Sequence, residues 1–162
     1  MAEFLTKMAS ALDAVDLVRQ EANRQLDPKR KSALGQFMTP SVVAKYMASL
    51  FTANSEGTVR LLDPGAGVGS LTAAFLERFL TLRNVKRIEV TAYEIDEVMQ
   101  SHLKATLKKF CTTARSSGLE MCGTVIVDDF IDAMCRPLLR GTQPPETCSR
   151  STGGGPTPPW RF

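Results

Sequence analysis

The chain has 162 residues, enough for one ordinary domain. Its content of 43% hydrophobic and 23% charged residues is typical of a globular protein. The net charge of +3 permits a nucleic-acid partner but does not require one. The N-terminus lacks the apolar run of a signal peptide, and no stretch of about 18 apolar residues occurs, so we expect no membrane partner. The four cysteines form no CxxC pair and His102 is the single histidine, which argues against a metal site and favours a cytoplasmic protein with reduced thiols.

Hydrophobic periodicity predicts helices and strands in alternation. Apolar residues at near-helical spacing predict a helix over residues 1–26, and a second helix is expected from about Pro40 to Phe51 with Thr39 as its N-cap. Alternating strands and helices then indicate an α/β fold with a parallel sheet and right-handed crossovers. The elements predicted for it are a strand at 59–63, a helix at 71–82, a strand at 88–94, a helix at 97–110 and a strand at 123–127.

Two stretches lie outside this pattern. Lys29-Arg30-Lys31 is a basic run that forms either a solvated loop or a DNA contact. Residues 141–162 contain no Val, Ile, Leu, Met or Ala, and nine of these 22 residues are Pro or Gly. Because such a segment buries little apolar surface, we expect a disordered tail, either native or the product of out-of-frame translation.

The strongest local signal is the glycine-rich turn after the first predicted strand. Gly65, Gly67 and Gly69 permit a tight turn and a close approach of a ligand to the backbone. Their GxGxG pattern differs from the GxGxxG of dinucleotide-binding proteins. Asp63, at the end of the strand, suits a ligand with a positive end, such as the ammonium of S-adenosylmethionine, better than a pyrophosphate. A plain glycine turn and a site for NAD or FAD are the alternatives.

Acids also end the next two predicted strands. Glu94 lies 25 residues after the last glycine of the turn, close to the spacing of an acid that binds ribose hydroxyls, and Ile95 would offer an apolar face to adenine. Alternatively, Glu94 or Asp96 caps the next helix. Asp129 would accept a hydrogen bond from an adenine amino group, with Phe130 against the ring, or would cap a helix of its own.

The segment GQFMTP precedes the second predicted helix. A helix N-terminus with a hydroxyl cap is a ready site for a carboxylate, so Thr39 would receive the methionyl carboxylate of S-adenosylmethionine. An ordinary capped helix is the alternative.

Together, GQFMTP, LLDPGAGVG, YEID and DDF resemble, in order and spacing, motifs X, I, II and III of bacterial DNA adenine N6-methyltransferases of restriction-modification type. The resemblance covers about residues 30 to 135. It implies a partial Rossmann-like S-adenosylmethionine methyltransferase sheet in residues 32–140, preceded by an N-terminal helical segment (1–31) and followed by the tail (141–162). It also implies double-stranded DNA as a partner.

The resemblance assigns cofactor-binding roles to the residues that match the motifs, and no catalytic role. They are Thr39 near the methionyl carboxylate, Asp63, Gly65 and Gly67 around the methionyl moiety, Glu94 on the ribose, Ile95 on the adenine ring, Asp129 at the adenine amine and Phe130 beside it.

The sequence departs from the family at its catalytic tetrapeptide, (D/N)PP(Y/F), which binds the target amine and stacks on the flipped base. No such tetrapeptide occurs, and neither Pro144-Pro145 nor Pro158-Pro159 follows an Asn or Asp. We therefore expect a truncated or frameshifted member that is inactive alone. One subunit of a split methyltransferase, a non-catalytic cofactor- or DNA-binding module and a nucleotide-binding oxidoreductase are the alternatives.

The resemblance also has a consequence for stability. The chain supplies the first three strands of the sheet, so the strand at 59–63 would be an exposed edge instead of a central strand. Unpaired backbone groups at such an edge pair readily with other chains. We expect a marginally stable, aggregation-prone or partner-dependent protein, which a second subunit that completes the sheet would stabilise.

Overall fold

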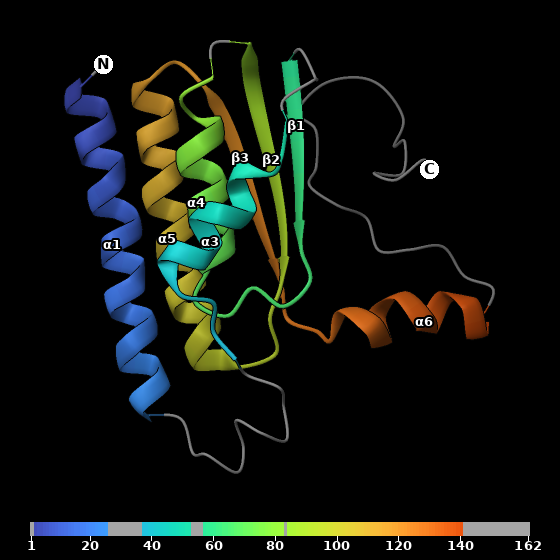
Figure 1. Cartoon of the computed structure of the whole chain (residues 1–162). Coiled ribbons are helices and arrows are strands. Elements are labelled where there is room, and N and C mark those ends of the chain that lie inside the picture. Colours follow the sequence, from blue (N-terminus) through green and yellow to red (C-terminus); the bar gives the residue numbers. More distant parts are fainter. Residues whose placement is uncertain (1, 26–36, 53–56, 83, 141–162) are drawn as a thin grey trace.

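The computed structural model describes residues 2–25, 37–52, 57–82 and 84–140 (Figure 1). The basic run at 29–31, the first two residues of GQFMTP and the tail at 141–162 lie outside the described residues. The predicted order of helices and strands is confirmed, with most bounds within three residues of those expected, although α5 ends six residues later than predicted. The last helix stood only as an alternative, through a cap at Asp129. The elements are α1 (Ala2–Gln25), α3 (Ser41–Ser49), β1 (Gly57–Asp63), α4 (Ser70–Phe79), β2 (Val85–Tyr93), α5 (Glu97–Ser116), β3 (Glu120–Ile126) and α6 (Phe130–Arg140).

The three strands form one parallel sheet in the order β1-β2-β3. Asp63 of β1 pairs with Ala92, and Tyr93 of β2 pairs with Ile126, so the carboxyl ends of all three strands meet at one edge of the sheet. The predicted parallel α/β fold, a partial Rossmann-like sheet, is therefore confirmed. β1 has a partner strand on one side among the described residues, and it is the edge strand that the sequence predicts.

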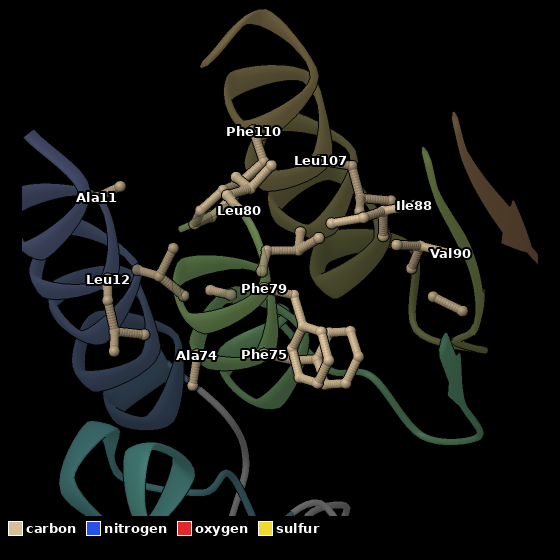
Figure 2. Packing of buried hydrophobic residues seen from close by; sticks show 14 of the residues in the cluster. Ala11, Leu12, Ala74, Phe75, Phe79, Leu80, Ile88, Val90, Leu107 and Phe110 are labelled. Atoms are coloured by element: carbon tan, nitrogen blue, oxygen red, sulfur yellow. The ribbon is translucent and has the colours of Figure 1, made fainter. Parts of the chain in front are cut away.

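Helices α1, α4 and α5 lie on one side of the sheet. Figure 1 shows α1, α4 and α5 together on this side, with α1 at the left of the view and β1 at the right edge of the sheet. Residues from α1, α4, β2 and α5 meet there in one apolar core, in which Leu12, Leu76, Ile88, Leu103 and Phe110 are each at most 1% exposed. Figure 2 shows Leu12, Ile88 and Phe110 among the packed side chains. The N-terminal helix therefore packs into the same core as the sheet.

The prediction that Thr39 caps the helix α3 is wrong. Pro40 occupies the N-cap position, with extended backbone and no side-chain capping bond. The backbone N–H of Ser41 instead donates to Oδ1 of Asp16, in α1, at 3.0 Å. Asp16 also accepts a hydrogen bond from Arg19 at 2.8 Å, and this bond is the largest influence that lowers the pKa of Asp16 to about 2. A carboxylate 25 residues upstream thus performs the role that local sequence assigned to a hydroxyl.

No helix in the described ranges is long and apolar enough to cross a membrane. The described residues also contain no group of three or more side chains suited to hold a metal ion.

Candidate functional site

An open cavity of about 190 Å³ lies beside the glycine-rich turn, at the carboxyl edge of the sheet. Four parts of the chain line it: the segment before α3, the turn between β1 and α4 with the start of α4, the residues that lead from β2 into α5, and Asp129 before α6. Ligands of open parallel α/β sheets bind at this edge. Of the residues predicted from sequence, the cavity brings together Thr39, Gly65, Gly67, Glu94, Ile95 and Asp129, whereas Asp63 and Phe130 are not among its lining residues.

The glycines of the turn differ in what surrounds them. A Cβ at Gly65 or Gly67 would meet no atom within 4 Å, so a ligand has room to approach the backbone there. Gly69 has a φ of +90°, and its Cβ would lie 3.0 Å from Cδ1 of Leu103 in α5. Gly69 is therefore required for the turn to pack against α5, while Gly65 and Gly67 leave the cavity open.

The buried side chain of Asp63 stabilises the glycine-rich turn. Its side chain is buried and accepts a hydrogen bond from Oγ1 of Thr72, in α4, at 2.6 Å. Burial away from water raises the pKa of this carboxyl, and hydrogen bonds from Thr72 and Gly65 act in the opposite direction. Asp63 therefore orients the turn and the first turn of α4, and a ligand in the cavity would meet it only indirectly.

Glu94 links the end of β2 to the turn. Its Oε2 accepts a hydrogen bond from the backbone N–H of Gly67 at 2.7 Å, and its Oε1 accepts one from the N–H of Asp96 at 2.8 Å. Asp96, the other acid considered as a helix cap, is the N-cap of α5 and accepts from the N–H groups of Val98 and Met99. Glu94 therefore presents a carboxylate to the cavity wall without capping the helix.

Asp129 lies at the far side of the cavity, after β3. Its Oδ1 accepts a hydrogen bond from the backbone N–H of Asp132 at 3.0 Å, which is a cap on α6. The capping role considered from the sequence is thus present, and Asp129 lines the cavity as well. The ring of Phe130 packs edge-on against Tyr93, with centroids 5.2 Å apart.

Several lining residues were not singled out from the sequence. They carry no charge, and helical periodicity alone assigns an apolar residue such as Met99, which is 3% exposed, to the core. Ser70 follows the glycine turn directly, and that position is the one signal that pointed to it. The additional residues are Phe37, Met38, Ala66, Val68, Ser70, Leu71 and Met99.

A glycine turn, a carboxylate at the next strand end and an open cavity between them lie at the edge where Rossmann-like proteins bind their ligands. No family model matches the chain. The chain is 39% identical over 132 residues to the Type II methyltransferase M.BsuBI of Bacillus subtilis. The aligned region covers 82% of this chain and 25% of M.BsuBI. The chain is also 41% identical over 140 residues to the Type II methyltransferase M.PstI of Providencia stuartii. This aligned region covers 86% of this chain and 27% of M.PstI.

A weaker similarity, 34% identity over 88 residues, relates the chain to the Type II methyltransferase M.HincII of Haemophilus influenzae. The chain is therefore homologous to Type II methyltransferases, which confirms the resemblance predicted from its motifs. It spans about a quarter of the length of M.BsuBI and M.PstI.

Proposed function

We propose that these residues are the S-adenosylmethionine-binding part of a site-specific DNA adenine N6-methyltransferase of a restriction-modification system. The observation that carries the proposal is the position of Glu94, whose carboxylate lies against the N–H of Gly67 at the wall of the cavity. Homology to Type II methyltransferases supports a methyl donor as the ligand. A cytoplasmic setting fits, since Cys111 and Cys135 are free thiols.

The lining residues fit the parts of this ligand. The carboxylate of Glu94 would accept two hydrogen bonds from the vicinal ribose hydroxyls, and such charge-assisted bonds are strong. Ile95, which is 43% exposed, would pack on adenine, and Asp129 would meet its amino group. Thr39 would face the methionyl carboxylate, and the turn around Gly65 and Gly67 would leave room for the methionyl chain. When bound, the ligand supplies an electrophilic methyl group.

The size of the cavity bears on affinity. At about 190 Å³ it is smaller than the ~300–1,000 Å³ of sites that enclose a whole ligand. It would cover part of a molecule such as S-adenosylmethionine and leave the rest open to water. We therefore expect weak binding by these 162 residues, in the micromolar range or above.

Transfer of the methyl group to DNA needs residues of another kind. No (D/N)PP(Y/F) tetrapeptide occurs in the sequence, so no acceptor and aromatic pair is present to hold a flipped adenine. We propose that double-stranded DNA is the substrate and that the missing groups come from further residues or from a second subunit that pairs with the edge of β1. Transfer of labelled methyl groups to adenine by the purified 162 residues would contradict this proposal.

The assignment of Glu94 is tested by Glu94→Ala, with Glu97→Ala as the matched control, since Glu97 is an exposed acid at the start of α5 outside the cavity lining. Loss of the charged hydrogen bonds should weaken S-adenosylmethionine binding by about 1–3 kcal/mol in Glu94→Ala and leave Glu97→Ala unchanged. Calorimetry measures both affinities, and thermal unfolding checks that the variants fold. Equal affinity of the wild type and Glu94→Ala would refute the ribose-binding role.

A further inference from the structure

The hydroxyl of Ser70 is a buried polar group with no role in the site as described so far. Ser70 is the first residue of α4, is 5% exposed, and lines the cavity. Its Oγ has no hydrogen-bond partner among the described residues. Glu77 and Arg78 also contain a buried atom without such a partner, but neither lines the cavity. Since burial of an unpaired hydroxyl costs free energy and native proteins rarely retain one, Ser70 points to a partner that enters the cavity.

The order of the strands indicates which part of a ligand would reach Ser70. Ser70 follows β1 and its turn, Glu94 ends β2, and Asp129 follows β3. A ligand whose ribose lies at Glu94 and whose base extends toward Asp129 would direct its remaining end back over the turn, toward α4. In S-adenosylmethionine that end is an amino acid, with a carboxylate and an ammonium group.

A hydroxyl suits this end, because it donates one hydrogen bond and accepts two. It can therefore donate to the carboxylate or accept from the ammonium. At the N-terminus of α3, where Thr39 would face the carboxylate, the N–H of Ser41 already donates to Asp16 at 3.0 Å, so Ser70 would supply a second contact to this end of the ligand. Gly69, the N-cap residue of α4, has no side chain that could cap the helix. The next residue, Ser70, places its hydroxyl at the cavity wall.

We propose that Ser70 is a cofactor-contact residue whose hydroxyl hydrogen-bonds the amino-acid end of S-adenosylmethionine. The inference rests on the proposed function and adds to it a residue that the motif resemblance did not assign. It distinguishes Ser70 from Glu94, which would bind the ribose and thus any ligand that contains adenosine.

The test compares three ligands on the wild type and on Ser70→Ala by calorimetry. S-adenosylmethionine and S-adenosylhomocysteine keep the amino-acid end, whereas 5′-methylthioadenosine keeps the adenosine and the sulfur and lacks that end. Ser70→Ala should bind the first two about ten-fold or more weakly and 5′-methylthioadenosine with unchanged affinity. Equal affinity of the wild type and the variant for S-adenosylmethionine would overturn the role of Ser70, and an equal loss for all three ligands would overturn its assignment to the amino-acid end.

The outcomes also separate this inference from the proposed function. A wild type that binds S-adenosylmethionine while Ser70→Ala binds it equally well removes the inference and keeps the proposed function. A wild type that binds no S-adenosylmethionine removes both.

Thermal unfolding without ligand supplies an independent readout, with Thr72→Val as the matched control on the same helix. The hydroxyl of Thr72 is buried and bonded to Asp63, so its loss should lower the Tm by roughly 2–8 °C. Ser70→Ala removes a hydroxyl without a described partner and should leave the Tm unchanged or higher. A fall in the Tm of Ser70→Ala as large as that of Thr72→Val would show that Ser70 already has a partner within the protein, and would overturn the inference.

Discussion

The two faces of the sheet are built differently. On the helix side, Leu76, Ile88 and Leu103 are completely buried between α4, β2 and α5. On the other face, Arg60 pairs with Glu89 at 2.9 Å, Glu89 pairs with Arg87 at 2.8 Å, and Arg87 pairs with Glu120, all of them at least partly exposed. Parallel sheets are usually covered on both faces, so the described residues complete one face of the sheet and leave the other to solvent-exposed ion pairs.

The carboxyl end of the outer face is the part that is covered. There Tyr93 is 4% exposed, and the ring of Phe130, at the start of α6, packs against it. The cavity lies at this same edge of the sheet, next to Glu94 and Asp129. Among the described residues, the helix side of the sheet is therefore closely packed, whereas β1 and most of the opposite face are partly exposed.

The largest expected effect contrasts one substitution on the two faces. Leu103→Ala removes a side chain that is 0% exposed, so it should lower the free energy of unfolding by about 2–5 kcal/mol. Leu62→Ala, on the partly exposed outer face of β1, should cost about 1 kcal/mol or less. Urea denaturation measures both. Equal losses would show that the outer face is packed as tightly as the helix face.

A smaller effect tests the turn that joins the core to the cavity. Gly69→Ala should lower the free energy of unfolding by about 1–3 kcal/mol, because Gly69 has a φ of +90° and its Cβ would press on Leu103. Gly65→Ala is the control, since Gly65 has no positive φ and open space around its Cβ. It should change stability by less than about 1 kcal/mol while it narrows the cavity. If Gly69→Ala and Gly65→Ala lower the free energy of unfolding by the same amount, the packing of the turn against α5 does not stabilise the turn.

The smallest effect concerns the bond between α1 and α3. The pKa of Asp16 is lowered to about 2, so its carboxylate contributes stability that is present above the unfolded pKa near 4 and is lost as the pH falls toward 2. Asp16→Asn should therefore be about 1–2 kcal/mol less stable than the wild type at pH 7, and the difference should shrink between pH 4 and pH 2. Thermal unfolding across this range measures it. A difference that stays constant with pH would mean that the charge of Asp16 does not stabilise the contact.

The features that the sequence predicts are those that depend on residues close together along the chain. The strands and the glycine turn follow from periodicity and from three closely spaced glycines. Glu94 is predicted at the cavity because an acid that ends a parallel strand lies at the edge where such sheets bind ligands. These are local signals. The bond from Asp16 to Ser41, the inward position of Asp63 and the unpaired hydroxyl of Ser70 depend on contacts between segments distant in sequence, and no local pattern contains that information.

The sequence predicts helix α6 only as an alternative, for a related reason. Its N-cap, Asp129, was assigned to a ligand, and the capping role stood as the alternative. The structure gives Asp129 a helix cap and a place at the cavity together, because the start of a helix after a parallel strand lies at the ligand edge.

Direct calorimetry of S-adenosylmethionine on the purified 162-residue chain, with NAD as the comparison ligand, tests the central claim. We predict saturable binding of one S-adenosylmethionine per chain and no binding of NAD at the same concentrations, because the turn has the GxGxG spacing and not the GxGxxG spacing of dinucleotide-binding proteins. No detectable binding of S-adenosylmethionine, or binding of NAD with equal or higher affinity, would contradict it.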